Sequence, residues 1–255
     1  MGLPERPAPP LAEPLKPVFD DLPVYRVGRV GPEHAYVGDI WLIKAPQGGI
    51  LVDSGGTSGL SLSLERIRAA GLDPREIHYL LLSHTHGDHI GGAYLWRSRG
   101  AKVVAPAPAA FTATWMIPTL NHYGIWVPCA IDQPLPLRRP GDTTHFNLDG
   151  LDVQAIFAPG HSFDTVVYAL TLAGRRVVFT GDIGFHVNND ILNRCWGDAP
   201  KARTVMNVLR EQILPLKPEF VFTGHDEHSN GVAYWEGILR VTEDAMRKAE
   251  SRRNH

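Results

Sequence analysis

The residues best suited to chemistry lie in one short stretch, residues 83–89, which reads SHTHGDH. His84 and His86 are two positions apart, so on extended chain their imidazoles project to the same side and can share one metal ion. Gly87 permits a tight bend, after which Asp88 and His89 can point to a second position a few ångströms away. Without a cation, these side chains would leave unpaired polar groups at the end of an apolar run, at considerable free-energy cost. The stretch therefore predicts ligands for two neighbouring metal ions.

Four shorter polar motifs also follow apolar runs. In chain order they are Val52-Asp53-Ser54-Gly55, Pro159-Gly160-His161-Ser162, Thr180-Gly181-Asp182 and Gly224-His225. Together with the stretch at 83–89 and the Gly91-Gly92 pair, they closely resemble the signature of the metallo-β-lactamase-fold superfamily, and in particular its glyoxalase II branch. The resemblance spans about residues 53–225. It implies an α/β fold, a four-layer αβ/βα sandwich in which two mixed sheets lie between helical layers.

The resemblance also implies two sets of metal ligands and the chemistry that they support. The first ion would be bound by His84, His86 and His161, the second by Asp88, His89 and His225, and Asp182 would bridge the two. Two divalent cations roughly 3.5–4 Å apart acidify a shared water and polarise the scissile bond. We therefore expect a metal-bridging hydroxide as the nucleophile, with Asp88 and Asp182 as the catalytic carboxylates. Imidazole and carboxylate ligands accept Zn²⁺, which we expect, and also Fe or Mn.

Asp53 and His186 are expected to support the site without binding metal. Asp53 resembles a buried family aspartate that orients the ligands, although a plain turn or helix-capping role is an equal alternative. His186 follows the bridging aspartate closely enough to border the substrate pocket. The remaining histidines match no family motif and are expected to be surface or packing residues: His34, His78, His122, His145, His228 and His255.

The expected substrate is a carboxylic ester, lactone or thioester of a small molecule. A formal net charge of −2 gives no global field to recruit nucleic acid, although a phosphodiesterase or nuclease of the same fold stays open. A mononuclear iron enzyme similar to the persulfide dioxygenases is a second alternative. Asp182 argues against an antibiotic-degrading role, because true β-lactamases of this fold lack the bridging aspartate. His86 argues against a flavodiiron oxygen reductase, because those enzymes place a glutamate at this position and carry an added flavin domain.

The positions of the motifs require strands that end at the polar clusters. Alternating or continuous apolar runs predict strands at residues 40–43, 49–52, 78–82, 101–104, 151–157, 166–172, 176–179 and 219–222. Amphipathic spacing predicts helices at 61–70, with Gly71 as a stop, and at 202–214 and 232–251. Two strand-rich stretches, each followed by helices, favour a duplicated α/β unit.

Length and composition predict one domain with two added segments. The 255 residues are 44% hydrophobic, which suits a single domain over residues 24–255 after a proline-rich extension at 1–23. Regularity breaks down over about 106–140, which predicts a lid whose Trp115, Tyr123 and Trp126 would line the substrate pocket. The alternative is that these aromatic side chains only pack the lid onto the core or against a second subunit. If the lid does not, the pocket walls should be sought first in residues 185–196.

The cellular setting is expected to be the cytoplasm, without membrane contact. No run approaches the roughly 18 consecutive apolar residues that span a bilayer, and the N-terminus shows no signal-peptide core. Cys129 and Cys195 lie far apart and are expected to be ordinary thiols. The sequence does not determine the oligomeric state.

Overall fold

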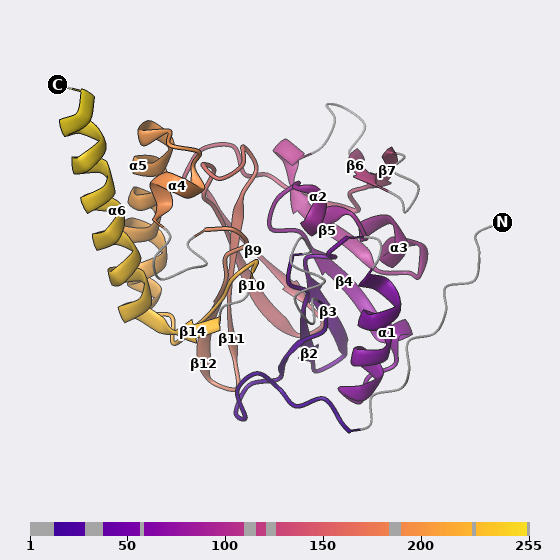
Figure 1. The fold of residues 1–255 in the computed structure, drawn as a ribbon. Coiled ribbons are helices and arrows are strands. Elements are labelled where there is room, and N and C mark those ends of the chain that lie inside the picture. The colour runs from indigo at the N-terminus through magenta and orange to yellow at the C-terminus, as the bar shows by residue number, and fades with distance from the viewer. Residues whose placement is uncertain are drawn as a thin grey trace.

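The computed structural model describes residues 13–28, 38–56, 59–109, 116–120, 126–183, 190–225 and 228–253. Two six-stranded sheets pack face to face, and helices cover the outer face of each (Figure 1). The order of layers is therefore helix, sheet, sheet, helix, which confirms the predicted four-layer α/β sandwich.

The first sheet is formed by the N-terminal half of the chain. The pairs β1–β2 and β2–β3 are antiparallel, whereas β3–β4, β4–β5 and β5–β8 are parallel, so the sheet is mixed. In pairing order its strands are β1 (Val24–Arg26), β2 (Trp41–Ala45), β3 (Gly48–Val52), β4 (Ile77–Leu81), β5 (Lys102–Pro106) and β8 (Gln133–Leu135).

The second sheet is formed by the C-terminal half and is mixed in the same way. The pair β12–β13 is parallel and the other four pairs are antiparallel. In pairing order its strands are β14 (His228–Asn230), β13 (Phe220–Phe222), β12 (Arg175–Phe179), β11 (Val166–Leu172), β10 (Leu151–Phe157) and β9 (Thr143–Leu148).

The helices lie on the outer faces of the sandwich. On the first sheet they are α1 (Leu60–Ala69), α2 (Gly87–Ile90) and α3 (Ala93–Ser98), and on the second sheet α4 (Ile191–Arg194), α5 (Ala199–Val208) and α6 (Gly231–Arg253) (Figure 1). Single 3₁₀ turns cover Pro74–Glu76, Ala107–Ala109 and Leu214–Leu216. Within the described ranges, no helix is both long and apolar enough to cross a membrane.

Alternation along the buried strands explains why three separate cores form. On β11, Tyr168 and Leu170 point between the sheets, whereas Val167 and Ala169 point to the outer helices. On β3, Ile50 likewise faces the space between the sheets. Strands buried on both faces read as continuous apolar runs, which is how they appear in the sequence.

The secondary structure of two stretches differs from the sequence prediction. Part of the segment 106–140 forms the hairpin β6 (Met116–Leu120) and β7 (Trp126–Ala130), and β8 joins the first sheet. Pro134 fits in β8 because this strand lies at the sheet edge, where a missing N–H is tolerated. The predicted helix at 202–214 begins earlier, as α5, and passes into a π-helical turn at Leu209–Ile213.

Candidate metal centre

The predicted ligands gather where strands of both sheets end. The stretch 83–89 follows β4 and enters α2, while His161 follows β10 after a short turn. Asp182 comes after β12 and His225 after β13. Each sheet thus contributes loops to one place, and the structure brings all seven predicted ligand residues together there.

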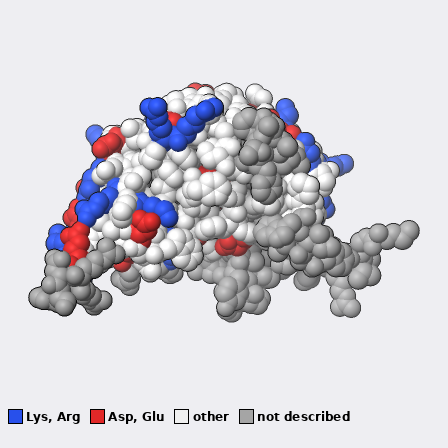
Figure 2. Space-filling model, turned by 90° about the horizontal axis from the view of Figure 1, so that it is seen from above, with Lys and Arg blue, Asp and Glu red and all other residues white. Residues whose placement is uncertain are grey.

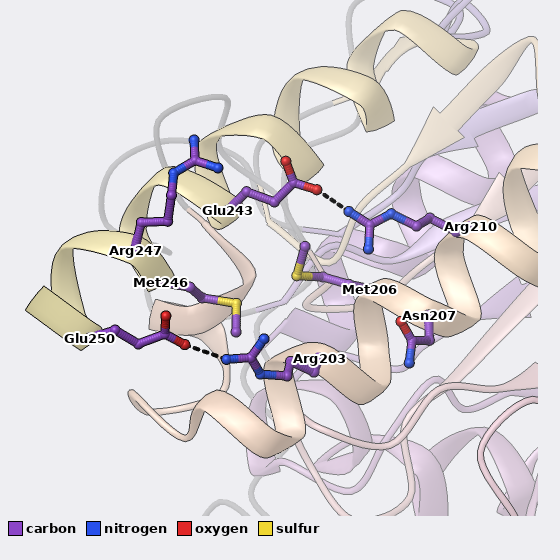
Figure 3. A pocket seen from close by; sticks show the side chains of 8 residues that line it. All are labelled: Arg203, Met206, Asn207, Arg210, Glu243, Met246, Arg247 and Glu250. Carbon is purple, nitrogen blue, oxygen red and sulfur yellow. Dashed lines mark hydrogen bonds and ion pairs between the residues drawn. The ribbon is translucent and has the colours of Figure 1, made fainter.

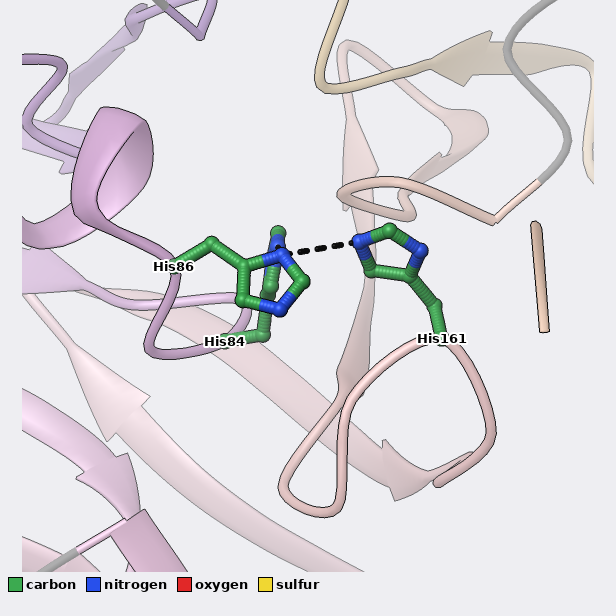
Figure 4. A group of neighbouring side chains, drawn as sticks. All are labelled: His84, His86 and His161. Atoms are coloured by element: carbon green, nitrogen blue, oxygen red, sulfur yellow. Dashed lines mark hydrogen bonds between the residues drawn. The ribbon is translucent and has the colours of Figure 1, made fainter. Parts of the chain in front are cut away.

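Three histidines converge in the first group. His86 Nδ1 lies 3.1 Å from His84 Nε2 and 3.0 Å from His161 Nε2. Figure 4 shows the rings of His84 and His86 on one loop, facing His161 on a loop of the other sheet. Three imidazole nitrogens within reach of one point match the donor set of a zinc site that has an open position.

Asp88, His89 and His225 form the second group, and Asp182 touches both groups. His225 Nε2 lies 3.1 Å from Asp88 Oδ2 and 3.3 Å from Asp182 Oδ2. Asp182 Oδ1 is 3.1 Å from His89 Nε2, and its Oδ2 is 3.4 Å from His161 Nε2. The Asp182 carboxylate is therefore placed to reach ions in both groups.

Burial makes two of these histidines electrically neutral. His84 is fully buried, and burial together with the nearby charge on His89 holds the pKa of His84 well below 6.5. Burial also lowers the pKa of His161 to about 4. Both imidazoles are therefore unprotonated at neutral pH, which is the form that binds a metal ion.

His225 and His89 carry protons that a cation could replace. Burial would lower the pKa of His225, but its bonds to Asp182 and Asp88 outweigh this and raise the pKa to about 9. Burial would also lower the pKa of His89, but the nearby negative charges of Asp182 and Asp53 outweigh this and raise it well above 6.5. For Asp182, burial would raise the pKa, but His89 and His225 hold it well below 3.8. Without a bound ion, these protons balance the carboxylate charge, and a divalent cation would displace them.

Asp53 binds the loop at residues 83–89, which carries four of the predicted ligands. Its carboxylate accepts hydrogen bonds from the Ser83 backbone N–H and hydroxyl, each at 2.7 Å. Asp53 Oδ2 also lies 2.8 Å from His89 Nδ1. The N-cap of α1 is Gly59, so Asp53 contacts the ligands and does not cap that helix. The opposite loop is held by a backbone group, because His161 Nδ1 lies 3.0 Å from the Arg194 carbonyl oxygen.

Glycine is required where two loops approach the cluster. A Cβ on Gly224 would overlap Asp182 Oδ1 and come within 2.8 Å of His89 Cε1. A Cβ on Gly38 would lie 2.8 Å from the same His89 carbon. The backbone therefore closes over His89 and Asp182 at a distance that no side chain allows.

Several predicted pocket residues cannot be placed. His186, Trp115 and Tyr123 lie outside the described residues, and Trp126 is described only through the backbone of β7. The two cysteines are placed and are buried. Burial raises the pKa of Cys129 to about 11 and that of Cys195 to about 12, so both thiols stay protonated.

A separate hollow of about 320 Å³ lies between α5 and α6 (Figure 3). Its charged groups are largely neutralised in pairs, Arg203 with Glu250 and Arg210 with Glu243. It shares no residue with the histidine cluster. These features fit helix packing rather than a binding site.

Sequence reasoning missed contacts that residue type does not reveal. The Arg194 carbonyl is a backbone group, so no side-chain pattern marks it as the partner of His161. Ser83 bridges Asp53 and His84, since its hydroxyl also lies 3.0 Å from His84 Nδ1. Its position directly before the first ligand was the available signal. Trp196, the last residue of the alternative pocket wall at 185–196, stacks on His161 with 5.9 Å between ring centroids.

Comparisons with curated proteins give modest sequence similarity. The chain is 30% identical over 170 residues to the lactamase-like protein nscB of Neosartorya fischeri, covering 64% of this chain and 44% of that protein. It is 28% identical over 148 residues to a hydroxyacylglutathione hydrolase of Aeromonas hydrophila, covering 57% and 46%. The chain thus spans less than half the length of these relatives.

Solved structures with the same fold include metallo-β-lactamases. A Cronobacter sakazakii metallo-β-lactamase with an HARLDQ motif aligns with a TM-score of 0.65 at 20% identity, covering 94% of this chain and 97% of that one. The subclass B3 enzyme BJP-1 of Bradyrhizobium japonicum aligns with a TM-score of 0.62 at 18% identity, covering 94% and 98%. At these identities the similarity concerns the fold alone.

The family model of the metallo-beta-lactamase superfamily matches residues 35–225, most of the chain and every predicted ligand. That match agrees with the two mixed sheets, the outer helices and the histidine and aspartate clusters between them. The chain therefore belongs to the metallo-beta-lactamase superfamily.

Proposed function

We propose that this chain is a metal-dependent hydrolase that uses two divalent ions to cleave a carboxylic ester, lactone or thioester of a small molecule. One observation carries the proposal. Asp182 lies within 3.4 Å of imidazole nitrogens from both ligand groups, so a single carboxylate joins two possible ion positions. An arrangement for one ion would need no such shared carboxylate.

The residues present fit such ions. Among the described residues, the buried atoms His89 Nε2 and Asp182 Oδ1 lie 3.1 Å apart as an ion pair, but neither makes a well-aligned hydrogen bond. Leaving buried polar atoms unpaired is costly, and a cation bound by both would remove that cost. We assign His84, His86 and His161 to one ion and Asp88, His89 and His225 to the other. The mixed nitrogen and oxygen donors suit Zn²⁺, and also Fe or Mn.

Bound divalent ions would supply the activation of water and the polarisation of the scissile carbonyl. The chain itself holds the ligands in place for this. The Arg194 carbonyl accepts a hydrogen bond from the Nδ1–H of His161, which leaves Nε2 directed at the cluster. Asp53 does the same for His89. Asp182 and Asp88 supply negative charge that would offset the charge of the ions.

The substrate class is supported by one group of relatives and by surface charge. Relatives of this chain include proteins named as hydrolases of hydroxyacylglutathione, a thioester. Figure 2 shows basic and acidic side chains interspersed on the face in view, without an extended basic patch among the described residues. Nucleic acids bind through such patches. We therefore favour a small carboxylic substrate over a nucleic acid.

The lid and the domain limits are part of the same proposal. We propose that residues 106–140 close over the ions, with Trp115, Tyr123 and Trp126 against the substrate and His186 at the pocket border. The contact between α2 and β6 supports this, because it brings the hairpin next to the helix that carries Asp88 and His89. Residues 24–255 would form one catalytic domain behind an extension at 1–23.

Elemental analysis followed by an activity screen tests the proposal. The purified protein should contain about two divalent ions per chain and hydrolyse at least one ester, lactone or thioester. Removal of the ions with a chelator should abolish the activity, and added Zn²⁺, Mn²⁺ or Fe²⁺ should restore it. Phosphodiesters and nucleic acids serve as the comparison set. One iron per chain with oxygen consumption and no hydrolysis would overturn the proposal in favour of an oxidoreductase.

A further inference from the structure

Two large apolar side chains in the described part of the chain are exposed, Phe163 at 66% and Trp196 at 74%. Single exposed apolar residues are common on protein surfaces. These two, however, line the same hollow of about 480 Å³, and His161 lines it as well. A volume of this size suits a small organic group. The hollow therefore adjoins the candidate metal centre.

The backbone at Trp196 is in a conformation that its side chain disfavours. Helix α4 ends at Arg194, and Trp196 has a φ of +58°, followed by Gly197 at +76°. Glycine takes this left-handed conformation without steric cost, whereas a tryptophan does not. Strained residues of this kind gather at functional sites. Neither burial nor the turn accounts for an exposed tryptophan here.

The indole of Trp196 is held against the candidate ligands. Its Nε1–H donates to the His161 carbonyl oxygen at 3.1 Å. Its ring stacks on the His161 ring, 5.9 Å between centroids at an interplanar angle of 23°. The His86 ring lies 6.4 Å away, edge to face. An apolar group in the hollow would thus lie beside the ring of a candidate metal ligand.

The remaining walls of the hollow offer few free polar groups. Pro140 and Pro159 add apolar surface, and the hydroxyls of Ser162 and Thr204 already donate to Asp164 and to the Pro200 carbonyl. Lys201 supplies the cation of this pocket, but its Nζ lies 3.2 Å from Asp198 Oδ2. That ion pair weakens the attraction for a substrate carboxylate. The hollow therefore favours an uncharged hydrocarbon group.

We propose that Phe163 and Trp196 form an apolar subsite that binds the alkyl or aryl chain of the substrate. This inference rests on the proposed hydrolysis. It narrows the substrate class, because such a subsite favours hydrophobic esters, lactones or thioesters over highly charged ones such as glutathione conjugates. The chain bound there can belong to the acyl group or to the leaving group, and two substrate series separate these sources.

Kinetics on matched substrates test the subsite. One series varies the acyl chain from two to eight carbons with a fixed alcohol, and the other varies the alcohol with a fixed acyl group. In one of the two series kcat/KM of the wild type should rise by up to about fourfold per methylene. Trp196→Ala and Phe163→Ala should flatten that rise, while Trp196→Phe should keep most of it. Arg203→Ala, in the hollow between α5 and α6, is the control and should keep it fully.

A positioning role for Trp196 gives a different result. The indole N–H binds the His161 carbonyl, and both Trp196→Ala and Trp196→Phe remove that bond. If the residue only positioned His161, both variants would lose metal to the same extent and keep the wild-type chain-length dependence. That outcome, or a wild type without chain-length dependence in either series, overturns the subsite.

Binding without turnover separates this inference from the proposed function. Straight-chain carboxylates from acetate to octanoate are titrated into the metal-loaded protein by calorimetry. Affinity that rises with chain length and is lost in Trp196→Ala supports the subsite, even if no ester is cleaved and the hydrolase proposal fails. Hydrolysis with chain-length-independent kinetics and binding refutes the subsite and leaves the hydrolase proposal intact.

Discussion

Oδ2 of Asp53 lies 2.8 Å from Nδ1 of His89, and Asp53 adopts a backbone φ of +61° at this contact. This contact directs the opposite ring nitrogen of His89 to Asp182 and Asp88. Asp53 also accepts two hydrogen bonds from Ser83. One strained aspartate thus orients the segment that carries four of the proposed ligands.

Asp53→Asn should weaken metal binding by about 10–100-fold, the usual effect of removing a carboxylate behind a ligating histidine. Asparagine also tolerates positive φ, so the backbone should not change. The affinity is measured by competition with a coloured chelator, with circular dichroism to verify the fold. Wild-type affinity in this variant would mean that Asp53 has only a structural role.

Asp182→Asn should lower the content of one or both ions and reduce hydrolysis by orders of magnitude while the fold survives. An amide has the size of a carboxylate but lacks the charge that a bridging ligand must offset. Metal content by elemental analysis and activity on the best substrate of the screen give the result. Normal metal content with a normal rate would remove Asp182 from the site.

Gly224→Ala should reduce metal content although it adds only one methyl group. The new Cβ would overlap Asp182 Oδ1, so Asp182 or the loop must move. Gly237→Ala in α6 is the matched control, because nothing lies within 4 Å of its Cβ position and alanine is the better helix former. The control should keep its metal and be at least as stable. Equal metal content in both variants would contradict the close approach.

The metal-free protein should lose stability as the pH rises. The pKa of His225 is raised from 6.5 to about 9, so its stabilising protonation is complete below pH 6.5 and is lost as the pH approaches 9. His89, whose pKa is also raised, acts in the same direction. Urea unfolding at pH 6 and pH 9 should differ by up to about 3 kcal/mol. His225→Gln should show a smaller difference; a wild-type protein equally stable at both values would refute the assignment.

The free energy of unfolding of the Trp196→Gly variant should exceed that of the Trp196→Ala variant by about 1 kcal/mol. Both variants lack the indole, and they differ mainly in their tolerance of positive φ. At Arg203, within α5, the order should reverse, since glycine weakens a helix. Thermal unfolding of the four variants measures both differences. Alanine as the more stable residue at both positions would show that the backbone at 196 relaxes to an ordinary conformation.

The sequence predicts the strands well where both faces of the strand are buried. Strands such as β10 and β11 appear as predicted because continuous apolar runs bounded by polar motifs have few other solutions. Short strands with one exposed face escaped detection. In β9, for example, exposed and half-buried positions alternate up to the buried Leu148, and the strand forms because β10 pairs with it.

The candidate site followed the same rule. The ligand residues could be named because histidine and aspartate carry their chemistry in the side chain, and the structure gathers them as expected. Contacts made by the backbone, such as the Arg194 carbonyl on His161, depend on tertiary folding alone. The exposure of Trp196 likewise depends on what packs around it, which residue type does not indicate.

Because the ligands come from both sheets, neither half of the chain holds a full set. His84 and His86 belong to the first half, and Asp182 and His225 to the second. An ion held between them would tie together segments that are distant along the chain, as a cross-link does. With metal bound, the two halves would then unfold and refold as one cooperative unit. Without the ion, the shared apolar core between the sheets and hydrogen bonds such as that from Tyr168 to the Leu82 carbonyl would couple them.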